Sequence, residues 1–162
     1  MTTHCQALRW IVALLGRMDV PFQAVGGLAA HAYGAQRPLA DLDFYIPTSR
    51  LDDVADEAGD FVSRPPSHFR SDSWDLTFMK IEREGRLIEL GGADGARYFD
   101  RQACRWREAG IDFGVSVERT LCGVSVPVMP RHQLIEYKER LDREVDRQDV
   151  ADLVGENQRS AG

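Results

Sequence analysis

Apolar side chains recur along the chain at the spacing of a helix face in several segments. Residues 5–18 carry them three and four positions apart, at Leu8, Ile11, Leu14, Leu15 and Met18. An alanine-rich stretch at 28–33 follows, and then residues 50–58, with apolar positions on one side and acids on the other. Two more helices are predicted near the C-terminus, one from Pro130 to about Leu141 and one that follows Asp146. Asp149, three positions after Asp146, resembles an acidic capping box.

Other segments alternate apolar and polar residues, which is typical of strands with one buried face. Residues 41–46 and 74–81 alternate in this way, and 86–90 answers 74–81 across a Glu84-Gly85 turn, which predicts a β-hairpin. Short apolar segments predict further strands at 22–25, 115–117 and 121–128. Residues 63–72 are rich in Ser, Pro and Arg and are predicted to be an irregular loop. The Gly-rich residues 91–95 are predicted to be flexible, and residues 96–114 are predicted to be surface structure of no assigned type.

These elements predict an α/β (α+β) fold in which a small mixed sheet is flanked by helices and the C-terminal helices pack on one side. We find no internal repeat and no linker-like composition in the 162 residues. The sequence therefore predicts a single domain over residues 1–157 and a frayed tail over 158–162.

Charge and cysteine content narrow the classes of function. A formal net charge of −6 disfavours general binding of duplex nucleic acid, although a metal ion would still permit a nucleotide. No apolar run is long enough to span a membrane and no secretory leader is visible, so the cytoplasm is the expected location. Cys5, Cys104 and Cys122 are odd in number and widely spaced. This argues against a disulfide framework and a zinc cluster, and predicts that Cys122 is a buried thiol.

Candidate chemistry lies in residues 25–43. Asp41 and Asp43 are two apart on a predicted strand, so their side chains point to the same face. Adjacent carboxylates repel each other, and folds that hold them together usually supply a cation, which phosphoryl transfer also needs. Gly26-Gly27 precedes a predicted helix, where bare backbone N–H groups can approach a phosphate. Each feature alone has a simpler explanation as a turn or a solvated strand edge, but their order and spacing are more specific.

This arrangement resembles the nucleotidyltransferase superfamily that includes DNA polymerase beta. The resemblance is closer to the small lincosamide and aminoglycoside nucleotidyltransferases and to abortive-infection-type proteins. It rests on Gly26-Gly27, a short helix, Arg37, and Asp41-Leu42-Asp43 on a strand. Three later patches are also similar, namely 86–90 with its acid Glu89, Val126–Pro130 before a helix, and Lys138 followed by Arg143, Asp146 and Asp149.

The resemblance implies a two-metal site and a transfer reaction. Asp41, Asp43 and Glu89 would hold two Mg²⁺ ions (Mn²⁺ is an alternative), and Glu89 would act as general base. Gly26, Gly27, Arg37 and Lys138 would bind the nucleotide. The implied reaction moves a nucleoside monophosphate from an NTP to a hydroxyl acceptor and releases pyrophosphate. The acceptor would be an antibiotic-like small molecule, a protein or an RNA, and a homodimer or a toxin partner is left open.

Simpler interpretations remain for several of these residues. Glu89 could be an exposed strand acid, Arg37 and Lys138 could be surface residues, and Asp146 and Asp149 could be caps and salt-bridge partners. The competing function is a catalytically weak or inactive binding module, such as a toxin–antitoxin component. An enzyme requires all three acids on one face, whereas a binding module predicts that Glu89 points elsewhere and that a large apolar patch is exposed.

Overall fold

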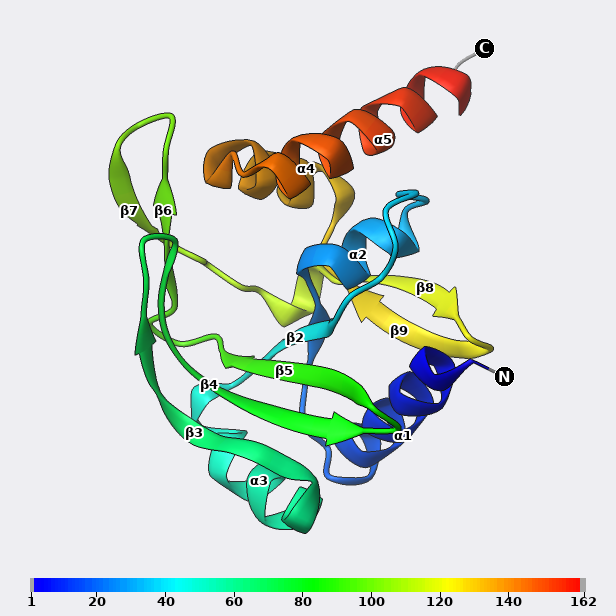
Figure 1. Cartoon of the computed structure of the whole chain (residues 1–162), viewed down its shortest axis with the longest axis vertical. Coiled ribbons are helices and arrows are strands. Elements are labelled where there is room, and N and C mark those ends of the chain that lie inside the picture. The colour runs from blue at the N-terminus through cyan, green and yellow to red at the C-terminus, as the bar shows by residue number, and fades with distance from the viewer. Residues whose placement is uncertain (1, 161–162) are drawn as a thin grey trace.

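The computed structural model describes residues 2–160, and for residues 156–160 it describes the helical backbone only. Its fold is a curled mixed sheet with helices at both ends of the molecule (Figure 1). The helices are α1 (Thr3–Arg17), α2 (Gly26–Ala32), α3 (Leu51–Ala58), α4 (Arg131–Leu141) and α5 (Glu144–Ser160), with short 3₁₀ turns at Thr48–Arg50, Gly59–Phe61 and Phe113–Val115. These helices correspond to the five helical segments predicted from the sequence, although α2 begins earlier, at Gly26, and α5 begins at Glu144, before Asp146.

The strands form one sheet in the order β7-β6-β4-β5-β2-β1-β9-β8, with β3 paired to β4. Their bounds are β1 (Gln23–Ala24), β2 (Leu42–Ile46), β3 (Val62–Arg70), β4 (Trp74–Arg83), β5 (Arg86–Gly92), β6 (Arg97–Asp100), β7 (Arg105–Glu108), β8 (Val117–Leu121) and β9 (Val124–Val128). The pairs β2–β5 and β1–β9 are parallel and the others are antiparallel, so the sheet is mixed as predicted. The predicted 74–81/86–90 hairpin is confirmed as β4–β5.

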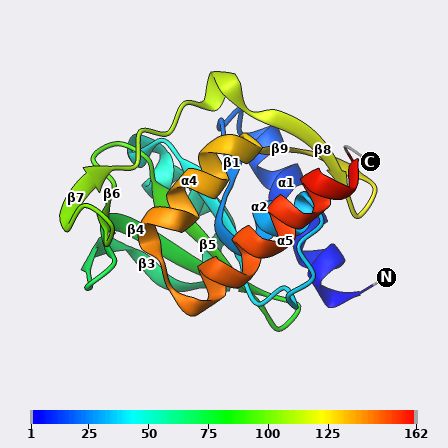
Figure 2. The ribbon, with the colours of Figure 1, turned by 90° about the horizontal axis from the view of Figure 1, so that it is seen from above.

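Helices cover the sheet from two sides. The predicted face of α1 is buried at Ala7, Leu8, Ile11, Leu14 and Leu15, and α3 packs against β3 and β4. The helices α4 and α5 lie side by side above α2, at the opposite end of the molecule from α1 and α3 (Figures 1 and 2). This arrangement confirms that the C-terminal helices pack on one side.

The predicted loop at 63–72 is wrong, because residues 62–70 form β3 along the edge of β4. Pro65 and Pro66 obscure this strand in the sequence, since proline lacks the N–H that a ladder uses. The pairing with β4 shifts register on both sides of Arg64, which lets the chain carry the two prolines within an edge strand. The strand therefore forms from pairing with its neighbour and not from its own composition.

The predicted flexibility of 91–95 is wrong for Gly91 and Gly92, which end β5 beside β2. A Cβ on Gly91 would lie 2.9 Å from the ring of Tyr45, and one on Gly92 would lie 2.6 Å from Oγ1 of Thr48. The two glycines therefore permit close packing against β2. The unassigned stretch 96–114 holds the antiparallel pair β6–β7.

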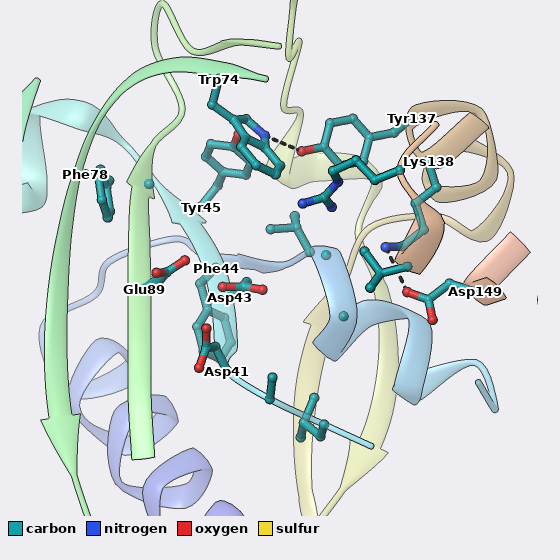
Figure 3. A pocket seen from close by; sticks show the side chains of 18 of the residues that line it. Asp41, Asp43, Phe44, Tyr45, Trp74, Phe78, Glu89, Tyr137, Lys138 and Asp149 are labelled. Atoms are coloured by element: carbon teal, nitrogen blue, oxygen red, sulfur yellow. Dashed lines mark hydrogen bonds and ion pairs between the residues drawn. The ribbon is translucent and has the colours of Figure 1, made fainter. Parts of the chain in front are cut away.

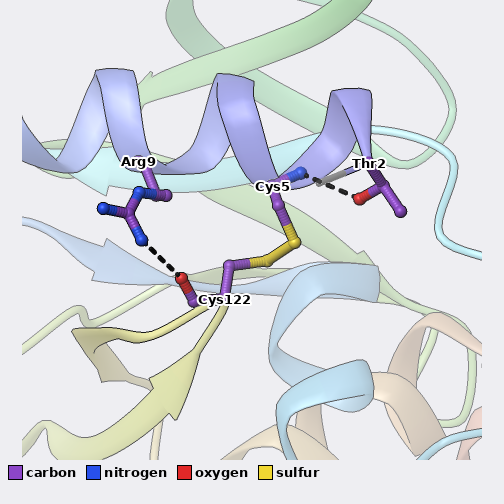
Figure 4. The surroundings of a disulfide bond; sticks show 4 residues. All are labelled: Thr2, Cys5, Arg9 and Cys122. Atoms are coloured by element: carbon purple, nitrogen blue, oxygen red, sulfur yellow. Dashed lines mark hydrogen bonds between the residues drawn. A yellow bond between two sulfur atoms is a disulfide. The ribbon is translucent and has the colours of Figure 1, made fainter.

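The structure contains a disulfide between Cys5 and Cys122, 117 residues apart, which the sequence argument did not predict (Figure 4). It joins the first turn of α1 to the tight turn between β8 and β9. In the same place Arg9 donates to the carbonyl of Cys122 over 3.2 Å. Cys122 is half-buried and is not the buried thiol expected, while Cys104 is exposed and free. The pairing could not be read from the sequence because only the fold brings α1 beside the β8–β9 turn.

The capping of α5 also differs from expectation. The helix α5 extends through Ser160, so the predicted tail at 158–162 overlaps its end, and residues 161 and 162 lie outside the described part. Asp146 does not precede the helix but lies in its first turn, where it accepts from the backbone N–H of Arg143 over 3.2 Å. In the described residues, no helix is both long enough and apolar enough to cross a membrane.

Candidate active site

A cleft of about 510 Å³ lies between the sheet and the C-terminal helices. One wall consists of β2, β4, β5 and the end of β3, and the facing wall consists of the start of α2 together with α4 and α5. The lining includes all seven residues that the sequence singled out as site candidates, namely Gly26, Gly27, Arg37, Asp41, Asp43, Glu89 and Lys138. The fold therefore collects positions from 26 to 138 at one place.

The three candidate acids face the same part of this cleft (Figure 3). Parallel pairing of β2 with β5 places Asp43 directly opposite Glu89. Asp41 lies just before β2 and two positions from Asp43, so alternation turns both carboxylates to one side of the sheet. Glu89 is one-third exposed and has an ion-pair partner, Lys80, whose Nζ is 3.7 Å from its Oε1.

Asp43 is electrostatically strained. Burial, followed by the charge and hydrogen bonding of Glu89 and then the charge of Asp41, raises the pKa of Asp43 from 3.8 to about 8. Lys138 acts in the opposite direction but does not compensate. A carboxyl group with this pKa holds its proton near neutral pH, because the carboxyl group is buried and lies beside other acidic side chains.

The start of α2 is fitted closely around Asp43. The N–H of Val25 donates to the carbonyl of Asp43 over 3.0 Å, and no side chain caps the helix. Gly26 has φ +58°, and a Cβ there would lie 2.9 Å from Oδ2 of Asp43. A Cβ on Gly27 would lie 3.2 Å from the Arg37 guanidinium. The paired glycines therefore bring bare backbone beside the carboxylates, which a side chain at either position would obstruct.

Arg37 and Lys138 belong to a buried charge network on the helical wall. Lys138 is 1% exposed and lies 3.0 Å from Asp149 and 3.2 Å from Asp146. Arg37 donates twice to Asp149, over 2.9 and 3.1 Å. Burial raises the pKa of Asp149, but hydrogen bonds from Arg37 and Lys138 outweigh burial and leave it below its ordinary value. Lys138 is thus no surface residue, and Asp146 and Asp149 are salt-bridge partners, as the simpler interpretation expected.

Aromatic side chains complete the cleft, and none of them was among the predicted site residues. Trp74 donates from its indole N–H to the Tyr137 hydroxyl over 2.9 Å (Figure 3). Trp74, Leu76, Phe78 and Lys80 occupy alternate positions of β4 and all line the cleft. Their alternation was visible in the sequence and could have assigned them to one face. Nothing in the sequence indicated that Arg64 and Phe69, from the presumed loop, would join them.

The carboxylate cluster fits a divalent cation by its chemistry. Oxygen ligands suit Mg²⁺ and Mn²⁺, and a buried carboxyl with a raised pKa is stabilised when a cation replaces its proton. The carboxylates of the cluster do not form a metal-ligand set as they stand. Residues 2–155 contain no group of three His, Cys, Asp or Glu side chains placed to hold a metal. Asp41, Asp43 and Glu89 could therefore hold such an ion only if their carboxylates moved closer together.

Comparison with known proteins identifies the fold. Neither the family models nor the curated proteins searched match the chain. Among solved structures, a candidate nucleotidyltransferase from Thermotoga maritima is similar, with a TM-score of 0.67, 16% identity and 96% coverage of both chains. The lincomycin-bound lincosamide adenylyltransferase LnuA has a TM-score of 0.59 and 14% identity, with 92% of this chain and 95% of LnuA covered. ANT(2″)-Ia in complex with adenylyl-2″-tobramycin has a TM-score of 0.58 and 17% identity, with 98% and 94% covered.

These similarities confirm that the chain has the nucleotidyltransferase fold, as the resemblance implied. At such identities they establish the fold alone.

Proposed function

We propose that this chain, which has the nucleotidyltransferase fold, transfers a nucleoside monophosphate from an NTP to a hydroxyl acceptor and releases pyrophosphate. The observation that carries the proposal is the pairing of Asp43 with Glu89 across two parallel strands, facing an open cleft. A binding module has no need of two abutting carboxylates, one of which, Asp43, has its pKa raised to about 8 by burial and then by the charge and hydrogen bonding of Glu89. The position of Glu89 thus favours the enzyme over the binding module.

The cleft has one side suited to phosphates. Gly26 and Gly27 bring backbone N–H groups to the carboxylates, and Arg37 and Lys138 contribute positive charge behind them. We assign the triphosphate to this side, with its α-phosphorus near Asp43. The acceptor then enters from the opposite side, along β4 and β5.

The reaction is a substitution at the α-phosphorus. The acceptor oxygen forms a bond to phosphorus as the bond to the bridging oxygen of the β-phosphate breaks, so pyrophosphate leaves with the bonding electrons. Glu89, one-third exposed and beside Asp43, takes the proton of the attacking hydroxyl and passes it to solvent. Lys80, whose Nζ lies 3.7 Å from Oε1 of Glu89, orients that carboxylate. Mg²⁺ held by Asp41, Asp43 and Glu89 would neutralise charge on the phosphates.

The first test is the thermal midpoint of the purified protein with each of the four NTPs, with and without Mg²⁺. Ligand at a hundredfold excess over its Kd stabilises by roughly 2.7 kcal/mol, and each kcal/mol raises the midpoint of a chain this size by about 2–4 °C. We expect a rise of several degrees that needs both metal and nucleotide and is absent in Asp43→Asn. Pyrophosphate release in the presence of lincomycin, tobramycin and other hydroxylated acceptors then tests transfer. No shift with any NTP would refute the proposal and favour the binding module.

A further inference from the structure

The part of the cleft formed by β3 and β4 carries an apolar and cationic surface that the transfer step does not use. We call Arg64, Phe69, Trp74, Leu76 and Phe78 the acceptor wall, since all five line the cleft from β3 and β4. In Figure 3, Phe78 lies on one side of the carboxylates, and Lys138 with Asp149 lies on the other. The acceptor wall therefore borders the space in which an acceptor would approach the triphosphate at Asp43 and Glu89.

Within the part of the chain that the structure describes, Arg64 differs from the other basic residues of the cleft in having no acidic partner. Arg37 and Lys138 are paired with Asp149, Arg143 with Asp146, and Lys80 with Glu89. Among the described residues, Arg64 forms no ion pair. Its side chain makes a single long hydrogen bond, 3.5 Å from Nη2 to the carbonyl of His68, and its buried Nε has no hydrogen-bond partner.

The Arg64 guanidinium is nonetheless held in place by aromatic rings. Its central carbon lies 4.6 Å from the centroid of the Phe78 ring and 5.8 Å from that of Phe69. Phe69 and Phe78 contact each other edge to face, with centroids 5.3 Å apart, and Phe69 is 37% exposed. An oriented guanidinium with unused donors, bordered by partly exposed rings, is suited to a planar group that carries an anion.

We propose, on the basis of the nucleotidyl transfer above, that the acceptor is a small hydroxylated molecule with a planar apolar ring and an anionic group. The ring packs on Phe69 and Phe78, and the carboxylate or phosphate binds Arg64. No residue of the acceptor wall is acidic, so an acceptor rich in ammonium groups meets a cation there without a counter-charge.

The geometry of the sheet connects this subsite with the reacting groups. Phe78 pairs with Gly91 and Lys80 pairs with Glu89, so Glu89 lies two residues along the β4–β5 ladder from Phe78. Two residues of a strand span about 7 Å, which is the length of a small substituted ring. A ring on Phe78 that is anchored at Arg64 can thus present a hydroxyl to Glu89. A long anionic polymer such as RNA is disfavoured by the net charge of −6.

The test uses three probes of similar size whose charge differs: anionic 4-(hydroxymethyl)benzoate, neutral 4-(hydroxymethyl)benzamide and cationic 4-(hydroxymethyl)benzylamine. Dissociation constants are measured by NMR titration of the full chain, with and without Mg²⁺ and α,β-methylene-ATP. We expect the benzoate to bind at least tenfold more tightly than the benzylamine, with the benzamide between them. A fourth probe, 4-(hydroxymethyl)phenyl phosphate, distinguishes the two anions. It should bind more tightly than the benzoate only if the anionic group of the natural acceptor is a phosphate.

Variants test whether the acceptor wall causes the preference for the anionic probe. Arg64→Gln should reduce benzoate affinity to that of the benzamide and leave benzamide affinity unchanged, whereas Phe78→Leu should weaken all probes. The matched control is Arg83→Gln, because Arg83 also stacks on a ring, 4.3 Å from the Phe61 centroid, but lies outside the cleft. The control should leave the three affinities as they are.

The outcomes separate this proposal from the function it rests on. Equal or tighter binding of the benzylamine, or binding of no probe at all, overturns the acceptor assignment even if Mg²⁺ and an NTP stabilise the protein. Tighter binding of a ribotrinucleotide than of the benzoate also overturns it in favour of an RNA end. The expected order of probes without any nucleotide effect would uphold the wall as a binding site and refute the transfer reaction.

Discussion

Replacing Asp43 with Asn should stabilise the metal-free protein while abolishing its response to metal and nucleotide. The pKa of Asp43 is raised from 3.8 to about 8 in the fold, so ionising it there is unfavourable. Below the pKa of the unfolded chain, 3.8, the carboxyl group is protonated in both states and does not affect the stability of the fold. As the pH rises above 3.8 the folded state loses stability, and the loss is complete above the folded-state pKa of about 8. At pH 7 the penalty is at most about 4 kcal/mol, since each pKa unit corresponds to 1.36 kcal/mol. Because the raised pKa reflects interacting carboxylates and not Asp43 alone, we expect a gain of about 1–3 kcal/mol.

The assay is urea unfolding in EDTA at several pH values, supported by thermal midpoints. The gain should be small at pH 5, grow to pH 8 and level off above it, with a midpoint rise of about 2–10 °C at neutral pH. Asp72→Asn is the control, because Asp72 is an exposed carboxylate outside the cleft. Destabilisation of Asp43→Asn, or a gain that does not change with pH, would refute the account of a strained carboxylate cluster.

Three further outcomes follow from contacts described above. Gly26→Ala should lose the stabilisation by Mg²⁺ and NTP because its Cβ would lie 2.9 Å from the Asp43 carboxylate, whereas Gly59→Ala, with the same φ of +58° and open space around it, should keep it. Asp149→Asn should cost about 3 kcal/mol at pH 7 because it breaks a buried pair. The depressed Asp149 pKa means that this contribution is present above pH 3.8 and is lost as the pH falls further, so urea unfolding of variant and wild type should converge in acid. Reducing the disulfide should lower stability by about 2–4 kcal/mol in wild type and Cys104→Ser alike, and an unchanged midpoint in dithiothreitol would contradict the bond's structural role.

The sequence predicted those parts of the fold in which local pattern and tertiary packing agree. The buried face of α1 and the β4–β5 hairpin are examples, because each carries its own periodicity or turn. The prediction failed where a neighbour decides the structure. Residues 62–70 become a strand through pairing with β4, and Gly91 is fixed by the ring of Tyr45.

The candidate site divides in the same way. Two-residue spacing was enough to put Asp41 and Asp43 on one face, and the structure adds Glu89 opposite Asp43 through a strand pairing that spacing cannot specify. The roles assigned to these acids remain predictions. The buried pairing of Lys138 with Asp146 and Asp149 depends on the packing of α4 against α5, so no local pattern could predict it.

The disulfide also bears on where the protein works. Disulfides persist in oxidising compartments and are rare in the cytosol, so the Cys5–Cys122 pair does not fit easily with the cytoplasmic location predicted from the sequence. The location stays a prediction. Mass spectrometry of protein alkylated on cell lysis would decide it, because a reducing compartment leaves both thiols modified.

The two prolines of β3 have a consequence for association between molecules. The structure pairs β3 with β4 on one side and, within the described residues, with no strand on the other. An open strand edge invites another chain to add a strand, and long apolar edges lead to aggregation. Pro65 and Pro66 offer no N–H to such a partner, and the charges of Arg64 and Arg70 oppose a second copy. Pro65 and Pro66, which make the strand hard to recognise in the sequence, thus protect the free edge of β3 beside the cleft from self-association.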